Sequence, residues 1–345
     1  MKINFTKIIL AGISGAVLAP ALQAAQINLI TVGGNASIKL IQDRLKNGGF
    51  LTGVTLNNNS TNSLIFNAIG SFGGKTVDWE FNLTGGAGAI TDIANNTPVT
   101  LQNNSTAVPQ LAISIVAPET VGIDSSPYQQ DLTLVAPTVF VRGSALGGVT
   151  NITQRQASYL ESSGYTLPAT YFGGTNNDFV AYVGRNGIAA VRQLIDANVY
   201  FAGSAANFTT NTVPPYTTVQ PYVGAGSGSE VAAIVNVLTN SVGTVAAQDI
   251  NGLPTLSYEG VPYSTANVIN GTYPLWGYER YIYLPGSLSS DQQNLVTALE
   301  NAVIDPTLES TSSLFIGKFV SLAAINPING RSTTADGGPI FSNQY

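Results

Sequence analysis

The sequence predicts an α/β fold with two lobes, and three observations support this class. A short apolar strand, a Gly/Ser-rich turn and an amphipathic helix follow one another at three places along the chain. About 320 residues remain beyond a predicted export signal, which is enough for two lobes of roughly 100 to 200 residues each. Segment 252–283 combines two polar turns, a Gly-Thr-Tyr-Pro corner and an aromatic run with a strand-like pattern.

Residues 1–25 have the pattern of a secretory signal peptide. Lys2 and Lys7 form a positive head, an apolar run follows from Ile8 to Leu18, and small residues suit cleavage between Ala21 and Ala25. The apolar run is shorter than the roughly 20 residues of a membrane-spanning helix. We therefore expect a periplasmic or extracellular protein that is not anchored in a membrane.

The absence of cysteine and histidine narrows the chemistry that the chain can perform. Without cysteine there is neither a disulfide framework nor a lipid-anchoring residue after the signal peptide. Without histidine, Ser-His-Asp and Cys-His catalysis and His-based zinc sites are excluded. Glu259 and Glu279 are candidate acids, but no local spacing brings them together. We therefore expect a protein that is not an enzyme and that needs no metal or cofactor.

The charge of the chain argues against polyanionic partners. Removal of Lys2 and Lys7 leaves 11 basic against 19 acidic side chains, so the charge of the exported chain is near −8. A negative protein is not attracted to nucleic acid or to an anionic membrane, and we expect neither partner. Only 9% of the residues are charged, against about 25% in ordinary soluble domains. The surface must therefore consist largely of uncharged polar residues.

The first strand–turn–helix unit opens directly after the signal. Ile27 to Val32 is predicted as a strand, and the turn 33–37 leads into a helix that begins near Ile38. Backbone N–H groups at such a helix start can hold an anion. The alternative interpretation is a tight turn that needs glycine for its conformation.

The second and third units follow the same order. Thr76 to Phe81 is predicted as a strand, followed by the turn Thr84 to Gly88 and a helix from about Ile90. Leu111 to Val116 and Val135 to Val141 have the continuous apolar character of buried strands. The Asn-rich patches 57–62 and 103–105 are predicted to be solvated loops.

Later elements are marked by their helix caps. Asn151 or Thr153 suits the cap of a helix that ends at Gly164, and Ser227 or Ser229 suits the cap of the next one. Ser289 suits the cap of the last helix. The tail from Asn326 is rich in Gly, Asn and Ser and is predicted to be irregular.

The segment GLPTLSYEGVPYSTANVINGTYPLWGYERYIY (252–283) resembles the C-terminal crossover of PstS-like phosphate-binding proteins. This resemblance implies a type 2 periplasmic-binding-protein fold, in which hinge crossover strands connect the lobes. Lobe 1 would comprise residues 26–135 and 268–345, and lobe 2 residues 136–267. The family delivers orthophosphate to ABC importers, so an importer permease would be the implied partner.

The phosphate motifs of this family are only partly present. TGGAGAITDIA resembles the second ligand loop, and AISIVAPE aligns with an Ala-x-Ser-Asp strand end, so that Ile115 stands in place of the acidic acceptor. In YVGRNGIAAVR, Arg185 matches the family arginine, but residues 189–191 replace Ser-Gly-Thr. Each lost donor or acceptor weakens binding by about 1 to 3 kcal/mol. The resemblance therefore implies a degenerate phosphate site.

We accordingly expect a secreted solute-binding protein that binds an unidentified small, anionic ligand between its lobes. One alternative is a structural protein that assembles with itself at the cell surface, and another is a phosphate receptor of an ABC importer. Otherwise Arg185 and Arg192 would be solvated or would pair with Asp178 and Asp196. Aromatic residues such as Trp79, Tyr182, Tyr222 and Trp276 would either stack on a ligand or form core. The expected site consists of Gly34, Asn35, Ala36, Ser37, Thr84, Gly85, Gly86, Ser114, Arg185, Arg192, Ser227 and Gly228.

Overall fold

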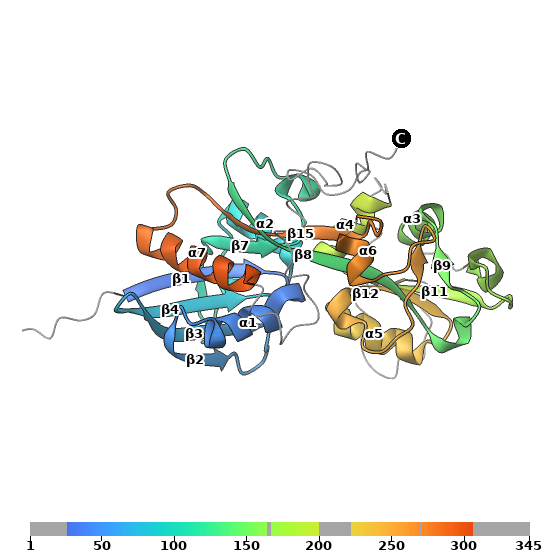
Figure 1. Cartoon of the computed structure of the whole chain (residues 1–345), viewed down its shortest axis with the longest axis horizontal. Helices are drawn as coiled ribbons and strands as arrows, with labels where there is room; N and C mark the ends of the chain where they lie inside the picture. Colours follow the sequence, from blue (N-terminus) through green and yellow to red (C-terminus); the bar gives the residue numbers. More distant parts are fainter. Residues whose placement is uncertain (1–25, 164–166, 200–221, 270, 306–345) are drawn as a thin grey trace, which may run out of the picture.

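One mixed β-sheet runs through both lobes of the computed structural model, which describes residues 26–163, 167–199, 222–269 and 271–305 (Figure 1). Within these residues the sheet has eleven strands, in the order β10-β11-β13-β8-β15-β7-β1-β4-β3-β2, with β12 beside β11. The predicted signal peptide, the helix end at Gly164 and the tail from Asn326 lie outside the described residues. Helices cover the sheet in both lobes, so the fold is the two-lobed α/β class that the sequence predicts.

Lobe 1 holds the end of the sheet that begins with the N-terminal strand. Strand β1 is parallel to both β4 and β7, so the loops that follow these three strands meet at one edge of the sheet. The elements of this lobe are β1 (Gln26–Gly33), α1 (Ile38–Asn47), β2 (Thr52–Asn58), β3 (Ile65–Phe72), β4 (Lys75–Asn82), α2 (Gly86–Asn95), β5 (Val99–Thr100), β6 (Thr106–Ala107), β7 (Leu111–Ser114) and α7 (Ser290–Ile304).

Lobe 2 repeats the arrangement around β11, which is parallel to β12 and β13. Helices α3, α4, α5 and α6 all lie in the right-hand half of Figure 1, together with β9, β11 and β12. The elements are β9 (Asn151–Ile152), α3 (Gln154–Ser163), β10 (Leu167–Pro168), β11 (Phe179–Arg185), α4 (Ala190–Asn198), β12 (Tyr222–Ala225), α5 (Gly228–Val237), β13 (Ser241–Ala246), β14 (Ser257–Tyr258) and α6 (Thr265–Ile269).

Two long antiparallel strands, β8 (Gln129–Arg142) and β15 (Trp276–Tyr283), connect the lobes. Strand β8 pairs with β13 in lobe 2, and β15 pairs with β7 in lobe 1. Val268, Tyr273 and Leu275 pack in the hydrophobic core of lobe 2. We therefore propose that the chain returns to lobe 1 within β15 rather than at residue 268.

Three hydrophobic clusters hold the molecule together. One fills lobe 2 around Phe140 and Tyr182, and a second fills lobe 1, where Trp79, Phe66 and Phe81 stack on one another. A third joins the lobes, because Ile90 of α2 and Leu194 of α4 belong to the same cluster. The lobes therefore share an apolar interface.

The helix starts follow the sequence signals closely. Thr153 and Gln156 bond reciprocally at the start of α3, Ser227 accepts from the Glu230 amide, and Ser289 forms a capping box with Gln292. Such caps satisfy N–H groups that a helix cannot bond internally.

Two expectations about loops were wrong. Helix α2 begins at Gly86, one turn before the expected position. The Asn57–Asn62 patch is a solvated loop only in part, because Asn57 and Asn58 belong to β2 and Asn59 is buried, whereas Ser60 and Thr61 are exposed outside the strand. The Asn59 amide donates to the backbone of Leu101 and Gln102, and its oxygen accepts from Thr61. Buried amides need such partners, which only the folded chain provides.

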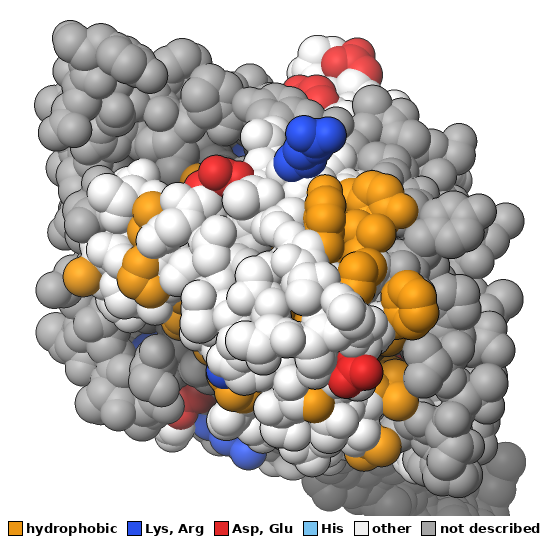
Figure 2. Space-filling model, turned by 90° about the vertical axis from the view of Figure 1, so that its right-hand side faces the viewer, with side chains coloured by type: hydrophobic (Ala, Val, Ile, Leu, Met, Phe, Trp, Pro, Cys, Tyr) orange, Lys and Arg blue, Asp and Glu red, His pale blue; other side chains and the backbone are white. Residues whose placement is uncertain are grey.

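White atoms, which belong to the backbone and to side chains that are neither apolar nor charged, dominate the described surface at this end of lobe 2, where Lys, Arg, Asp and Glu side chains are sparse (Figure 2). Apolar side chains gather along one side of this face. None of the helices in the described part of the chain combines the length and the apolar character needed to cross a membrane.

Candidate anion-binding pocket

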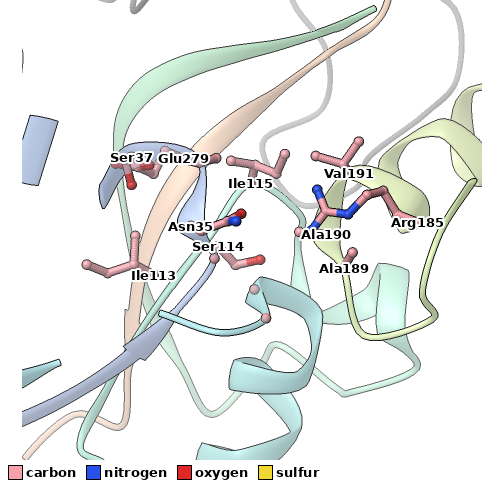
Figure 3. Close-up of a pocket in the computed structure, with 14 residues that line it drawn as sticks. Asn35, Ser37, Ile113, Ser114, Ile115, Arg185, Ala189, Ala190, Val191 and Glu279 are labelled. Carbon is pink, nitrogen blue, oxygen red and sulfur yellow. The ribbon is translucent and has the colours of Figure 1, made fainter. Parts of the chain in front are cut away.

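A pocket lies between the lobes at the carboxyl ends of β1, β4, β7 and β11 (Figure 3). Ligands of α/β sheets characteristically bind at this edge, where the loops after several strands converge. The empty space is about 350 Å³, including its open mouth. The pocket is lined by Gly34, Asn35, Ala36, Ser37, Gly85, Gly86, Ile113, Ser114, Ile115, Arg185, Ala189, Ala190, Val191 and Glu279.

Arg185 supplies the positive charge of the pocket. It is the last residue of β11, it is 3% exposed, and its guanidinium points into the cavity toward Ala190 (Figure 3). One nitrogen, Nη2, donates to the Gly226 carbonyl at 3.1 Å. Nε and Nη1 are buried and have no hydrogen-bond partner among the described residues. Because buried donors without acceptors are costly, these two nitrogens are suited to an anionic ligand.

The environment of Arg185 lowers its pKa without removing its charge. Burial lowers the pKa of Arg185 to about 10, although Asp249 and Glu230 raise it in the opposite direction. Burial also raises the pKa of Asp249, which Arg185 and Lys39 lower. The acids near Arg185 are therefore Asp249 and Glu230, and not Asp178, which the sequence analysis considered as a partner. Arg185 remains a cation throughout the physiological pH range.

Helix α4 adds backbone donors to the pocket. Ala190 and Val191 form its first turn and line the cavity. The first N–H groups of a helix have no acceptor within the helix, and the helix dipole favours an anion there.

The first N–H groups of α2, unlike those of α4, bond to the other lobe of the protein. The N–H groups of Ala87 and Gly88 donate to the carbonyl of Ile188 at 3.2 and 3.3 Å. Ile188 belongs to lobe 2, so these two bonds cross between the lobes. A protein carbonyl thus occupies two donors of the segment that resembles the second ligand loop of the family.

Glycine allows the lobes to approach closely at this point. A Cβ atom added at Gly86 would lie 3.0 Å from the Ala190 Cβ and 3.3 Å from the Gly34 Cα. These distances are shorter than ordinary contacts. Gly86 therefore belongs to the pocket because it leaves room for lobe 2.

The structure brings together eight of the expected site residues and places the other four elsewhere. Thr84 donates to Asn82, Ser227 caps α5, and Gly228 packs against Asp249. The lining residues from the expected set are Gly34, Asn35, Ala36, Ser37, Gly85, Gly86, Ser114 and Arg185. Two turns and the end of β11 therefore converge on one pocket, while the turn before α5 does not line it.

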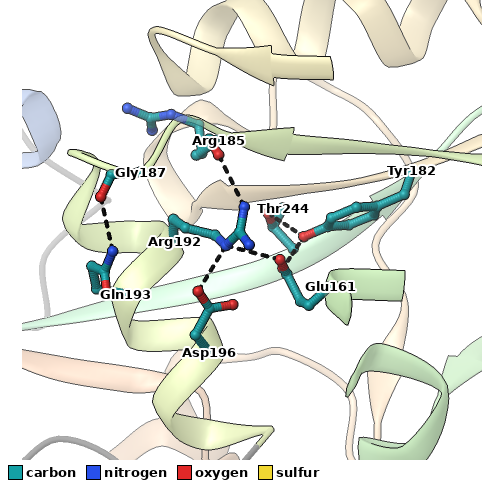
Figure 4. A network of polar contacts seen from close by, with 8 residues as sticks. All are labelled: Glu161, Tyr182, Arg185, Gly187, Arg192, Gln193, Asp196 and Thr244. Atoms are coloured by element: carbon teal, nitrogen blue, oxygen red, sulfur yellow. Dashed lines mark hydrogen bonds and ion pairs between the residues drawn. The ribbon is translucent and has the colours of Figure 1, made fainter. Parts of the chain in front are cut away.

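Arg192 is part of a buried network outside the pocket (Figure 4). Its Nε lies 3.0 Å from Glu161 and 2.8 Å from Asp196, which is the alternative partner considered from the sequence. Tyr182 donates to Glu161 and lies 3.1 Å from the Thr244 hydroxyl. The helical turn of α4 directs Arg192 toward α3 instead of the cavity. Arg192 thus has a structural role in lobe 2.

Three of the four aromatic residues that the sequence analysis considered for ligand stacking form core. Trp79, Tyr182 and Trp276 are buried and do not line the pocket. The side chain of Tyr222 lies outside the described part of the structure.

Glu279 lines the pocket, although the sequence analysis did not place it there. It is 1% exposed. Burial raises the pKa of its carboxyl to about 7, and the hydroxyls of Ser37 and Thr133 partly offset this effect. The sequence signal was a single acidic residue in an aromatic strand, where a charge is unexpected.

Comparisons with known proteins support the fold. No family model and no curated protein matches the sequence. An ABC-type phosphate transport receptor from Vibrio cholerae is similar with a TM-score of 0.53 and 15% identity, over 79% of this chain and 93% of that chain. A putative phosphate ABC transporter substrate-binding protein with bound phosphate from Clostridium perfringens has a TM-score of 0.53 and 12% identity, over 81% and 94%.

A phosphate-binding protein from Stenotrophomonas maltophilia has a TM-score of 0.51 and 13% identity, over 90% of this chain and 96% of that chain. These likenesses show that the chain has the two-lobed fold of periplasmic phosphate-binding proteins. They confirm the fold that the resemblance implied.

Proposed function

We propose that this chain is a secreted solute-binding protein that binds a small anion in the pocket between its lobes. The observation that carries this proposal is Arg185, a buried guanidinium with two nitrogens that have no partner among the described residues. The first turn of α4 adds N–H groups at the same place. Export is supported by the signal-peptide pattern of residues 1–25.

The walls of the pocket favour weak binding of orthophosphate. Ile115, Ala189, Ala190 and Val191 line the cavity, and none carries a hydroxyl or an acid. A receptor for a multiply charged anion needs many donors, because the ion loses its hydration on binding. We therefore expect phosphate to bind with a dissociation constant in the micromolar range or weaker.

Calorimetric titration with inorganic phosphate tests this proposal. Arg185→Ala should weaken phosphate binding about 100-fold, since it removes about 3 kcal/mol of charge-assisted hydrogen bonding. Arg155→Ala is the matched control, because Arg155 is an exposed cation on α3. This control should bind phosphate like the unaltered protein.

Two other outcomes would change the assignment. Sub-micromolar phosphate binding that depends on Arg185 would instead support the role of an ABC importer receptor, in line with the structural similarity to an ABC-type phosphate transport receptor. Absence of phosphate and sulfate binding would overturn the anion site and favour the role in assembly at the cell surface.

A further inference from the structure

The wall beside the Arg185 guanidinium is made of apolar side chains. Ile115, Ala190 and Val191 line the pocket around the point at which the guanidinium enters it (Figure 3). These three residues also belong to the hydrophobic cluster that joins the lobes, so core packing holds the wall in place. None of them carries a side-chain donor or acceptor. An anion at Arg185 therefore has hydrocarbon directly beside it.

The polar side chains of the pocket do not supply donors at this wall. Ser37 and Glu279 lie together at the end of the pocket opposite to Arg185 (Figure 3). The Ser114 hydroxyl accepts a hydrogen bond from the Val116 amide at 3.3 Å. The donors beside the apolar wall are therefore the guanidinium and the first N–H groups of α4.

The charge of the pocket fits a ligand with a single negative charge. Among the described residues that line it, Arg185 is the one base and Glu279 the one acid. Asp249 and Glu230 also act on the guanidinium from outside the lining. A buried ion is stable only where opposite charge compensates for its lost hydration. One guanidinium balances a monoanion, whereas a dianion would leave excess negative charge in the pocket.

We propose that the preferred ligand is a small organic monoanion, a short-chain carboxylate whose charged end meets Arg185 and whose alkyl part contacts Ile115 and Val191. This inference rests on the proposed anion site and adds the chemical class of its ligand. The carboxylate accepts hydrogen bonds from the Arg185 nitrogens that have no partner among the described residues. Each methylene that the wall buries raises the affinity about fourfold, which corresponds to about 0.8 kcal/mol.

Formate, acetate, propionate and butyrate are matched probes, because each carries one carboxylate and they differ only in the length of the alkyl part. Calorimetric titration with their sodium salts at constant ionic strength should show that butyrate binds at least about tenfold more tightly than acetate. Butyrate should also bind more tightly than inorganic phosphate and sulfate. An affinity that changes less than about twofold from formate to butyrate would overturn the proposal. Phosphate that binds more tightly than every carboxylate would overturn it too.

Val191→Thr tests the apolar wall with little change in its volume. The substitution replaces a methyl group by a hydroxyl, so the ratio of butyrate affinity to acetate affinity should fall to about threefold or less. The new hydroxyl can donate to an inorganic oxyanion, so phosphate affinity should rise about threefold or more. Phosphate binding thus also reports that the variant is folded. An unchanged ratio, or an equal loss of affinity for all four carboxylates, would contradict the proposal.

Val237→Thr is the matched control for this substitution. Val237 lies at the end of α5, is 56% exposed and does not line the pocket. This variant should keep the carboxylate ratio and the phosphate affinity of the unaltered protein. Equal effects of the two substitutions would overturn a specific role for the wall at Val191.

The outcomes separate the class of ligand from the anion site itself. Carboxylate and phosphate binding that is lost in Arg185→Ala but does not depend on alkyl length would overturn only the organic class. Absence of binding for phosphate, sulfate and all four carboxylates would overturn both the site and its ligand class.

Discussion

Arg185 and Arg192 show how the surroundings decide the role of a residue. Both are buried, and they lie seven positions apart in the chain. Arg192 has two acidic neighbours within 3.0 Å, whereas Arg185 retains two nitrogens without partners among the described residues. Only the surroundings of Arg185 leave hydrogen-bond donors for a ligand.

Replacement of Arg192 should destabilise lobe 2 directly. Arg192→Met would leave Glu161 and Asp196 buried without their cation, so we expect the free energy of unfolding to fall by about 3 to 5 kcal/mol. Urea unfolding measures this change, and Arg155→Met is the exposed control. A loss below about 1 kcal/mol would show that the network is not important for stability.

The sequence was sufficient to identify some site residues and not others. Arg185 and the turns at Gly34 and Gly85 follow from local strand–turn–helix patterns, and the structure brings them to one pocket. Glu279 could not be found in this way, because its position depends on pairing with β7 and on the register shift against β8. The sequence analysis wrongly included Arg192 in the site, because its partner Glu161 lies on another helix and could not be recognised from the local sequence.

At the scale of elements, buried strands and capped helices were predictable because their signals are local. Strand β1, helix α1 and the cap Ser289 lie within a residue or two of the expected positions. The β2–β3 hairpin was not predicted, because its Asn-rich sequence has the composition of a loop. Asn57 is nevertheless held in the strand by a side-chain bond to Asn67 of β3.

Because α2 and α4 approach closely, we predict different effects of substituting two glycines of α2. Gly86→Ala would place a methyl group 3.0 Å from the Ala190 Cβ and should push the lobes apart. At Gly88 the corresponding contact is 3.6 Å, which is ordinary, so Gly88→Ala should be tolerated. We expect anion affinity to fall at least about tenfold in the first variant only, as measured by calorimetry. Equal affinities would mean that the lobes adjust to the methyl group.

At the scale of the molecule, buried carboxyl groups predict how stability varies with pH. Burial raises the pKa of Glu279 and of Glu300 from 4.5 to about 7. The folded protein therefore binds more protons than the unfolded chain between these values. The resulting stability is fully present below about pH 4.5 and is lost as the pH rises to about 7.

We expect the free energy of unfolding to be lower at pH 8 than at pH 5 by a few kcal/mol, since one pKa unit corresponds to about 1.4 kcal/mol. Urea unfolding at the two pH values measures this difference. In Glu279→Gln the difference should be smaller, because one of the titrating groups is gone. A protein that becomes more stable as the pH rises would contradict the assignment of these acids.

The Ile188 carbonyl has a consequence for how the protein would respond to a ligand. Its two bonds to α2 join lobe to lobe through protein atoms alone. These bonds would have to break if the lobes separated, so they favour the closed arrangement even without a ligand. A ligand shifts an equilibrium between open and closed forms only by the difference between its affinities for the two forms. When most molecules are already closed, the apparent affinity for the ligand is not reduced by a rare binding-competent form. The shape of the protein then changes little when the ligand binds, so a partner has little change to detect. Because these two bonds hold the lobes together without a ligand, we expect closure to be a poor signal of occupancy in this molecule.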